Sequence, residues 1–115
     1  MTLAEMTESE PADAFAVGAF EDHELVAVGL IGPEGEPGAW RVRGMAARPE
    51  ARGQGAGTSV LEALLEHARA YGATRVWASV RIPARRLYER AGFRAISDEY
   101  EEPMIGPHVR MSRDL

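Results

Sequence analysis

The sequence predicts a single α/β domain with a mixed, mostly antiparallel sheet and two main helices packed on it, in the order β-β-β-α-β-α-β-β. Three observations predict this fold class. Short apolar runs separated by turn residues fill residues 14–47, which is typical of antiparallel strands. Two later segments carry apolar residues at helical spacing, and apolar runs of strand length separate them. Strands followed by strand–helix units form a mixed sheet with helices packed on it.

The first half of the chain is predicted to hold three strands. Residues 14–20 and 25–31 form a hairpin around the polar turn Glu21–His23, and residues 40–47 follow a Gly- and Pro-rich loop at 32–38. Residues 1–13 contain four acids and a proline, and they are predicted to be an acidic tail, either frayed or a short, weakly amphipathic segment.

The second half is predicted to alternate helices and strands. One helix spans 57–71 and ends at Gly72, and a second spans 83–91, with Pro83 in its first turn and Gly92 at its end. Strands are expected at 74–80, 93–101 and 108–112. The apolar stripe of the first helix consists of Val60, Leu61, Leu64, Leu65 and Ala68.

Composition narrows the function. The chain has 115 residues, which is one domain, and no cysteine, so thiolate metal sites and cysteine nucleophiles are excluded; no metal site is expected. All thirteen basic residues are arginine, which excludes a Walker A loop and Schiff-base chemistry. Residues 1–40 hold nine acids and no base, whereas residues 41–94 carry a local charge of +7. This balance favours a compact polyanionic ligand over nucleic acid. The sequence shows neither a leader pattern nor a long apolar run, so a cytoplasmic protein without a membrane partner is expected.

A glycine-rich turn at 48–57 separates the third strand from the first helix. Helix N-termini leave about four backbone N–H groups unpaired, and glycine allows an anion to come close to them. With Arg52 beside it, this turn is predicted to bind an anion such as a phosphate. A dinucleotide fingerprint does not fit, because Thr58 stands where the third glycine is required.

Two motifs resemble the GCN5-related N-acetyltransferase (GNAT) family. The turn Arg52–Gly57 matches the R-x-x-G-x-G/A loop of that family, and residues 84–93, ARRLYERAGF, match its A-x-x-L/F-Y-E-x-x-G-F helix. The segment 106–111, GPHVRM, is similar to the last strand of some small bacterial members. The resemblance covers residues 14–115 and implies a GNAT-like fold.

The resemblance also implies a co-substrate, acetyl-CoA, and residues that bind it. Backbone groups of the third strand would bind the pantetheine arm, loop amides would bind the pyrophosphate, and arginines near the second helix would contact cofactor or acceptor. The residues implied in cofactor binding are Met45, Ala46, Ala47, Arg52, Gly53, Gln54, Gly55, Ala56, Gly57, Thr58, Arg81 and Arg85.

Tyr88 is the first catalytic candidate, because a hydroxyl near the sulfur can protonate the departing thiolate. The alternative is that Tyr88 only packs on the sheet. The proton of the amine needs a base, and the third strand offers no carboxylate. His108 is preferred, because imidazole is the side chain that ordinarily titrates nearest to neutral pH; the remaining candidates are Glu24, Glu99 and Glu101.

The predicted function is transfer of an acetyl group from acetyl-CoA to an amine of a small molecule or peptide, by direct attack. The acidic first 40 residues favour a cationic acceptor. The family usually begins with a strand and two helices that wall the acceptor site, and these are not predicted here. Either the acceptor site is open, or a second copy of the chain supplies the wall in a homodimer. The alternative function is a non-catalytic acyl-CoA-binding module of the same fold.

Overall fold

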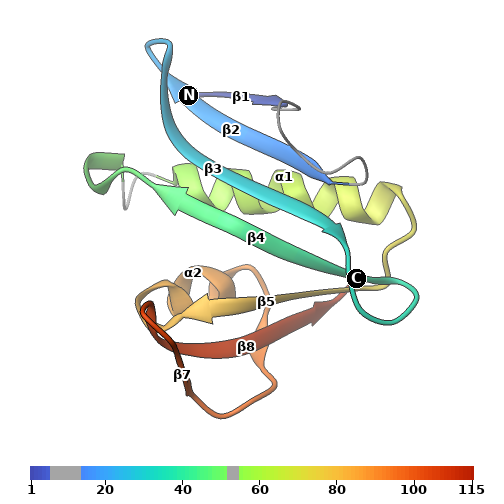
Figure 1. Ribbon diagram of the computed structural model, residues 1–115. Helices are drawn as coiled ribbons and strands as arrows, with labels where there is room; N and C mark the ends of the chain where they lie inside the picture. Colours follow the sequence, from blue (N-terminus) through green and yellow to red (C-terminus); the bar gives the residue numbers. More distant parts are fainter. Residues whose placement is uncertain (6–13, 52–54) are drawn as a thin grey trace.

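A computed structural model describes residues 1–5, 14–51 and 55–115 (Figure 1). Their strands form one sheet in the order β1-β2-β3-β4-β5-β8-β6, with β7 also paired to β8. The β4–β5 pair is parallel and all other pairs are antiparallel. The strands are β1 (Thr2–Glu5), β2 (Phe15–Glu21), β3 (Glu24–Pro33), β4 (Ala39–Ala47), β5 (Arg75–Arg81), β6 (Arg94–Ala95), β7 (Tyr100–Glu102) and β8 (Gly106–Asp114).

The helices lie where the sequence predicts them. Helix α1 (Ala56–Ala70) ends at Gly72, whose φ of 86° lets the Ala73 N–H reach the Ala68 carbonyl at 2.9 Å. Helix α2 (Arg85–Arg90) follows a 3-10 turn, η2 (Ile82–Ala84), and ends at Gly92. A further 3-10 turn, η1 (Pro49–Ala51), follows β4. The mixed α/β fold class is therefore confirmed. None of the helices in the described residues is long and apolar enough to cross a membrane.

The start of the chain differs from the prediction of a tail without a strand. Residues 2–5 form β1, which pairs antiparallel with β2 from Thr2↔Phe20 to Glu5↔Val17. All four side chains of β1 are exposed, so the strand is held by backbone hydrogen bonds and carries no hydrophobic pattern that could predict it. A strand thus precedes the β2–β3 hairpin.

The predicted strand at 93–101 is also wrong as a single element. It is two short strands, β6 and β7, which pair with opposite ends of β8. Between them, the Ser97 hydroxyl accepts the Arg110 N–H at 3.0 Å and donates to the Asp98 carbonyl at 2.9 Å. A serine side chain thereby replaces part of the backbone ladder, and the strand is interrupted there.

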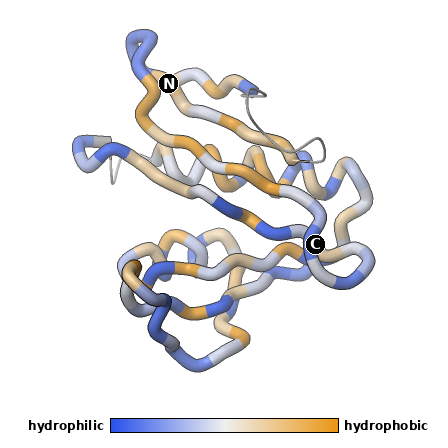
Figure 2. The backbone as a smooth tube through the Cα atoms, in the orientation of Figure 1, coloured by the Kyte–Doolittle hydropathy of each residue, from blue (hydrophilic) through white to orange (hydrophobic). Residues whose placement is uncertain are grey.

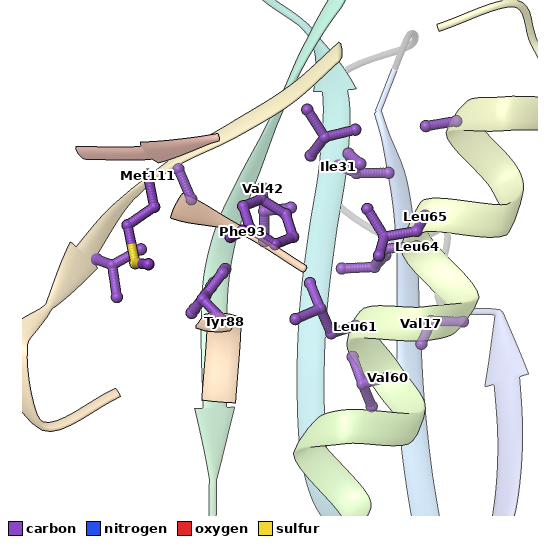
Figure 3. Close-up of a cluster of buried hydrophobic side chains, with 14 of the residues drawn as sticks. Val17, Ile31, Val42, Val60, Leu61, Leu64, Leu65, Tyr88, Phe93 and Met111 are labelled. Carbon is purple, nitrogen blue, oxygen red and sulfur yellow. The ribbon is translucent and has the colours of Figure 1, made fainter. Parts of the chain in front are cut away.

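The core lies between the helices and one face of the sheet (Figure 3). Helix α1 buries its apolar stripe against β2, β3 and β4, and Tyr88 of α2 joins the same cluster. Gly29 allows the close approach, because a Cβ there would lie 2.5 Å from Met45 Sδ and 3.0 Å from Leu64 Cδ1. Figure 2 shows hydrophobic residues along β2 and β3 and a hydrophilic stretch in β4. Among the described residues, the opposite face carries no helix.

An aromatic cluster closes the C-terminal end of α1. The His67 ring stacks on Phe15 at 3.8 Å between centroids and on Tyr71 at 4.5 Å, with Trp40 edge-on at 5.9 Å. Burial lowers the pKa of His67 from its ordinary value of 6.5, and the nearby Glu5 carboxylate opposes this shift. The folded chain therefore prefers the neutral imidazole.

We expect His67 to make stability fall in acid. As the pH drops below 6.5, the unfolded chain protonates first, so the stabilisation by the neutral ring is complete above 6.5 and is lost towards the lower pKa of the folded state. Urea unfolding at pH 7.5 and 5.5 should show a smaller loss for His67→Phe than for the wild type. The control His23→Asn changes an exposed turn residue with φ of 68° and should behave like the wild type. An equal loss in His67→Phe would contradict the assignment.

Candidate active site

The sheet opens where β4 and β5 part. The two strands pair from Ala39↔Arg75 to Val42↔Ala78 and not beyond. Past this point β4 stays paired with β3 as far as Ala47, and β5 stays paired with β8 as far as Arg81. Figure 1 shows the two strands diverging towards their arrowheads. The facing backbone edges at 43–47 and 79–81 therefore lack strand partners among the described residues.

A bulge at Gly44 accompanies the divergence. The β3–β4 register shifts between Val28 and Leu30, and Gly44 has a φ of 61°. A Cβ at this position would lie 2.5 Å from Leu30 Cδ1, so glycine is required both by the backbone angle and by space. Bulges bend a strand and increase its twist, which turns the end of β4 away from β5.

The predicted pantetheine-binding residues Met45, Ala46 and Ala47 lie on this open stretch of β4. Met45 points towards α1, against Gly29, and Ala46 is exposed. Their backbone groups on the β5 side have no strand partner in the described part of the chain and can hydrogen-bond an extended ligand, as an added strand would.

The N-terminus of α1 lies beside the opening. Gly55 is its N-cap, with a φ of 87° and no atom within 4 Å of where a Cβ would stand. The first helical bond runs from the Ser59 N–H to the Gly55 carbonyl at 2.9 Å, so the N–H groups of Ala56, Gly57 and Thr58 have no acceptor in the described residues. The first turn has neither a side-chain cap nor an acid. Unpaired amides at a helix N-terminus attract an anion. Arg52, Gly53 and Gln54 lie outside the described residues.

Tyr88 is both a core residue and a candidate acid. Its ring is 4% exposed and meets Phe93 edge-to-face at 5.1 Å (Figure 3). Burial raises the pKa of Tyr88, so the phenol stays protonated. The hydroxyl has no hydrogen bond in the described part of the chain. The hydroxyl oxygen also keeps contact with solvent. In the described part of the chain, Arg41 Nε is the one side-chain nitrogen or oxygen that is both fully buried and without a hydrogen-bond partner, so the Tyr88 oxygen is not fully buried. Tyr88 can therefore pack its ring in the core and still offer its hydroxyl as a proton donor.

His108 lies on β8, opposite Arg81 at the end of β5. It is 6% exposed, and its Nδ1 lies 2.9 Å from the Gly106 carbonyl. Because a carbonyl only accepts, Nδ1 carries the proton, and the lone pair of the neutral ring is on Nε2. Nε2 has no hydrogen-bond partner among the described residues. Like the Tyr88 hydroxyl it is not fully buried, so it keeps contact with solvent.

Two residues near His108 were not predicted from the sequence. Tyr100 of β7 pairs with His108, and its ring centroid lies 6.0 Å from the imidazole. The Tyr100 hydroxyl forms a hydrogen bond with Ser79 of β5, so its side chain spans β8. Only the register of β5, β7 and β8 brings these residues together, and the sequence carries no signal for it.

The other predicted residues are placed as follows. Arg81 is exposed at the end of β5, beside the opening. Arg85 binds Glu89 through Nε at 3.3 Å. Among the alternative bases, Glu24 binds Arg48 at 3.2 Å, and Glu99 and Glu101 are exposed; Glu101 alternates with Tyr100 and so points to the other face of β7. His108 is thus the candidate base whose ring lies next to β5.

Comparison with known proteins agrees with this geometry. The model of the acetyltransferase (GNAT) family matches residues 2–93, so the chain belongs to the GNAT family. An uncharacterized N-acetyltransferase, YitI, from Bacillus subtilis (strain 168) is 26% identical over 113 residues, which cover 94% of this chain and 76% of the relative.

Solved structures share the fold. An aminoglycoside 6'-N-acetyltransferase complexed with coenzyme A superposes with a TM-score of 0.83 at 12% identity, covering 99% of this chain and 97% of that one. The IAA acetyltransferase from Bacillus cereus ATCC 14579 gives 0.81 at 17% identity, with 99% of each chain covered. The ribosomal-protein-S18-alanine N-acetyltransferase from Escherichia coli gives 0.81 at 16% identity, with 98% and 92% covered.

Proposed function

We propose that this protein is an acetyl-CoA-dependent N-acetyltransferase that transfers the acetyl group directly to an amine. The observation that carries the proposal is the open backbone edge of β4 directly beside the uncapped N-terminus of α1. An extended thioester arm fits the first, and a pyrophosphate fits the second. The coenzyme A complex of a structural neighbour supports the same co-substrate.

The transfer needs one acid and one base. The amine nitrogen attacks the thioester carbonyl carbon, a C–N bond forms and the C–S bond breaks. His108 Nε2 takes the proton that the amine loses, and its Nδ1–H···O=C bond to Gly106 holds the ring in the required tautomer. The Tyr88 hydroxyl, kept protonated by burial, protonates the departing thiolate.

Binding of the co-substrate is the first test. Acetyl-CoA at 100 times its dissociation constant should stabilise the fold by about 2.7 kcal/mol, measured as a thermal shift. Gly55→Glu should abolish the shift, because it places a carboxylate where the phosphates bind. Gly72→Glu is the matched control, since Gly72 has a φ of 86° and equally open space at the other end of the same helix. Loss of the shift in both variants, or no shift in the wild type, would contradict the proposal.

The catalytic assignments predict separate effects on turnover and binding. Tyr88→Phe and His108→Gln should each slow thiol release by about 10²–10⁴-fold, because a positioned acid or base contributes that much. The thermal shift with acetyl-CoA should persist in both. Tyr71→Phe, which alters a side chain 69% exposed at the far end of α1, should leave the rate unchanged. If Tyr88→Phe turns over at the wild-type rate, Tyr88 only packs. If both variants do so, the non-catalytic acyl-CoA-binding module gains support.

We also propose a homodimer whose partner covers the apolar β2–β3 part of the helix-free face and leaves the opening between β4 and β5 accessible. The apolar hairpin residues divide between the two faces: Val17 and Ile31 lie under α1, whereas Val28 and Leu30 face the other way and are half-buried. Exposed apolar surface in a sheet favours a partner. Light scattering at micromolar concentration should give twice the chain mass of 12.5 kDa, and Leu30→Glu should shift the protein to monomer. A monomeric wild type would refute the dimer.

A further inference from the structure

The opening between β4 and β5 has a helix-free side, which no described helix covers. Both helices lie on the other face, and Leu87 of α2 packs within 3.5 Å of a Cβ position at Gly57 of α1. The α1 N-terminus assigned to the pyrophosphate is also on that face. The co-substrate therefore occupies the helix side, and the acceptor enters from the opposite side.

Arginines surround the opening on this free face. In β5 the buried residues Ala78 and Val80 alternate with Ser79 and Arg81, so Arg81 points away from the helices. The β5–β8 register pairs Ser79 with Arg110, which puts Arg110 on the same face. On the other side of the opening, Arg43 follows the buried Val42 and pairs with Leu30, and its side chain is 57% exposed.

These charges are only partly balanced. The Glu34 carboxylate is shared by two guanidinium groups, bonding Arg41 at 2.8 Å and Arg43 as well. Arg81 and Arg110 have no ion pair within the described residues, and Arg110 lies over the Trp77 ring at 5.5 Å from its centroid.

Three further acids lie towards this face, and two of them, Glu36 and Asp114, lie beside Arg75 at the far end of β5. Glu102 of β7 pairs with Gly106 near the hairpin tip, beyond the end of β5, and is half-buried. With Glu34 and Glu102 both counted, the four arginines Arg41, Arg43, Arg81 and Arg110 leave a positive excess at the mouth among the residues that the structure describes.

We propose that the acceptor is a small amine that also carries a carboxylate, as in an α-amino acid, and that Arg81 and Arg43 bind this carboxylate. The inference rests on the proposed function and names its substrate class. A guanidinium binds a carboxylate through two parallel hydrogen bonds, and Arg43 and Arg81 flank the opening from β4 and β5. The amine next to the carboxylate then lies at the thioester, on the side of His108. This proposal differs from the cationic acceptor that the composition of residues 1–40 favours. The acceptor interacts with the local charge at the mouth, which is positive, and not with the net charge of the chain.

Positive charge at the mouth also assists the chemistry. Neighbouring cations disfavour the ammonium form and thereby lower the pKa of a bound amine. A lysine-like acceptor has no carboxylate to offset this repulsion at the mouth, where the described residues hold more arginines than acids.

The test compares acceptors that differ only in the carboxylate. Thiol release with acetyl-CoA is measured for several amino acids, each beside its C-terminal amide and its decarboxylated amine. We expect kcat/KM for the free acid to exceed that for the amide by about 10- to 100-fold, as charge-assisted hydrogen bonds imply. Equal or better turnover of the amide or the amine would overturn the carboxylate assignment and leave the acetyltransferase proposal standing. Thiol release with none of these amines, together with no thermal shift by acetyl-CoA, would refute both.

Variants of single arginines test which side chains produce the preference for the free acid over the amide. Arg81→Gln and Arg43→Gln should each bring the acid-to-amide ratio of kcat/KM towards 1 while the thermal shift with acetyl-CoA persists. The control Arg75→Gln removes an arginine from the same face of β5 at its far end, where it binds Glu36 at 3.2 Å, and should keep the wild-type ratio. If Arg81→Gln abolishes the thermal shift and keeps the ratio, Arg81 binds the co-substrate and the proposal for it is wrong.

Discussion

The separation of β4 from β5 is the constraint on which the site depends. A strand has two edges, and beyond Val42 and Ala78 each of these two strands keeps only its outer neighbour, β3 or β8, among the described residues. The bulge at Gly44 bends β4 while its pairing with β3 continues, so the sheet opens without losing its outer ladders. The backbone groups left free are strong hydrogen-bonding groups that require a partner. An extended ligand is such a partner.

The two faces of the sheet differ in what they carry beside the opening. The connection from β4 to the parallel strand β5 contains α1, which covers the core face and brings its N-terminus to the open end of the sheet (Figure 1). The core is continuous from α1 through Tyr88 to Met111, so packed side chains fill the helix face beside the opening. The other face carries Arg43, Arg81 and Arg110 around the same opening. An anionic co-substrate and an anionic acceptor can thus approach one opening from opposite sides, each met by positive charge.

Tyr88 and His108 show how packing sets up chemistry. The Tyr88 ring completes the core beside Phe93, and the burial that this requires also keeps the phenol protonated. His108 owes its defined tautomer to the Gly106 carbonyl two residues earlier in β8. The Tyr100–Ser79 hydrogen bond spans β8 beside this ring. In each case an ordinary structural contact provides what the proposed acetyl transfer requires, a protonated phenol at Tyr88 and a lone pair on Nε2 of His108.

The sequence by itself determined the fold class, both helices, their glycine ends and the family motifs, because periodic apolar residues and glycines act through local backbone geometry. It could not reveal β1, whose exposed side chains leave only backbone bonds to β2, nor the break between β6 and β7 that Ser97 makes. The predicted role of the loop residues Arg52, Gly53 and Gln54 depends on the sequence motif alone. Only the tertiary structure decided that Arg43, Arg81, His108 and Tyr100 share one face beside the opening. Strand register sets which residues meet across a sheet, and long-range pairing, not local sequence, fixes that register.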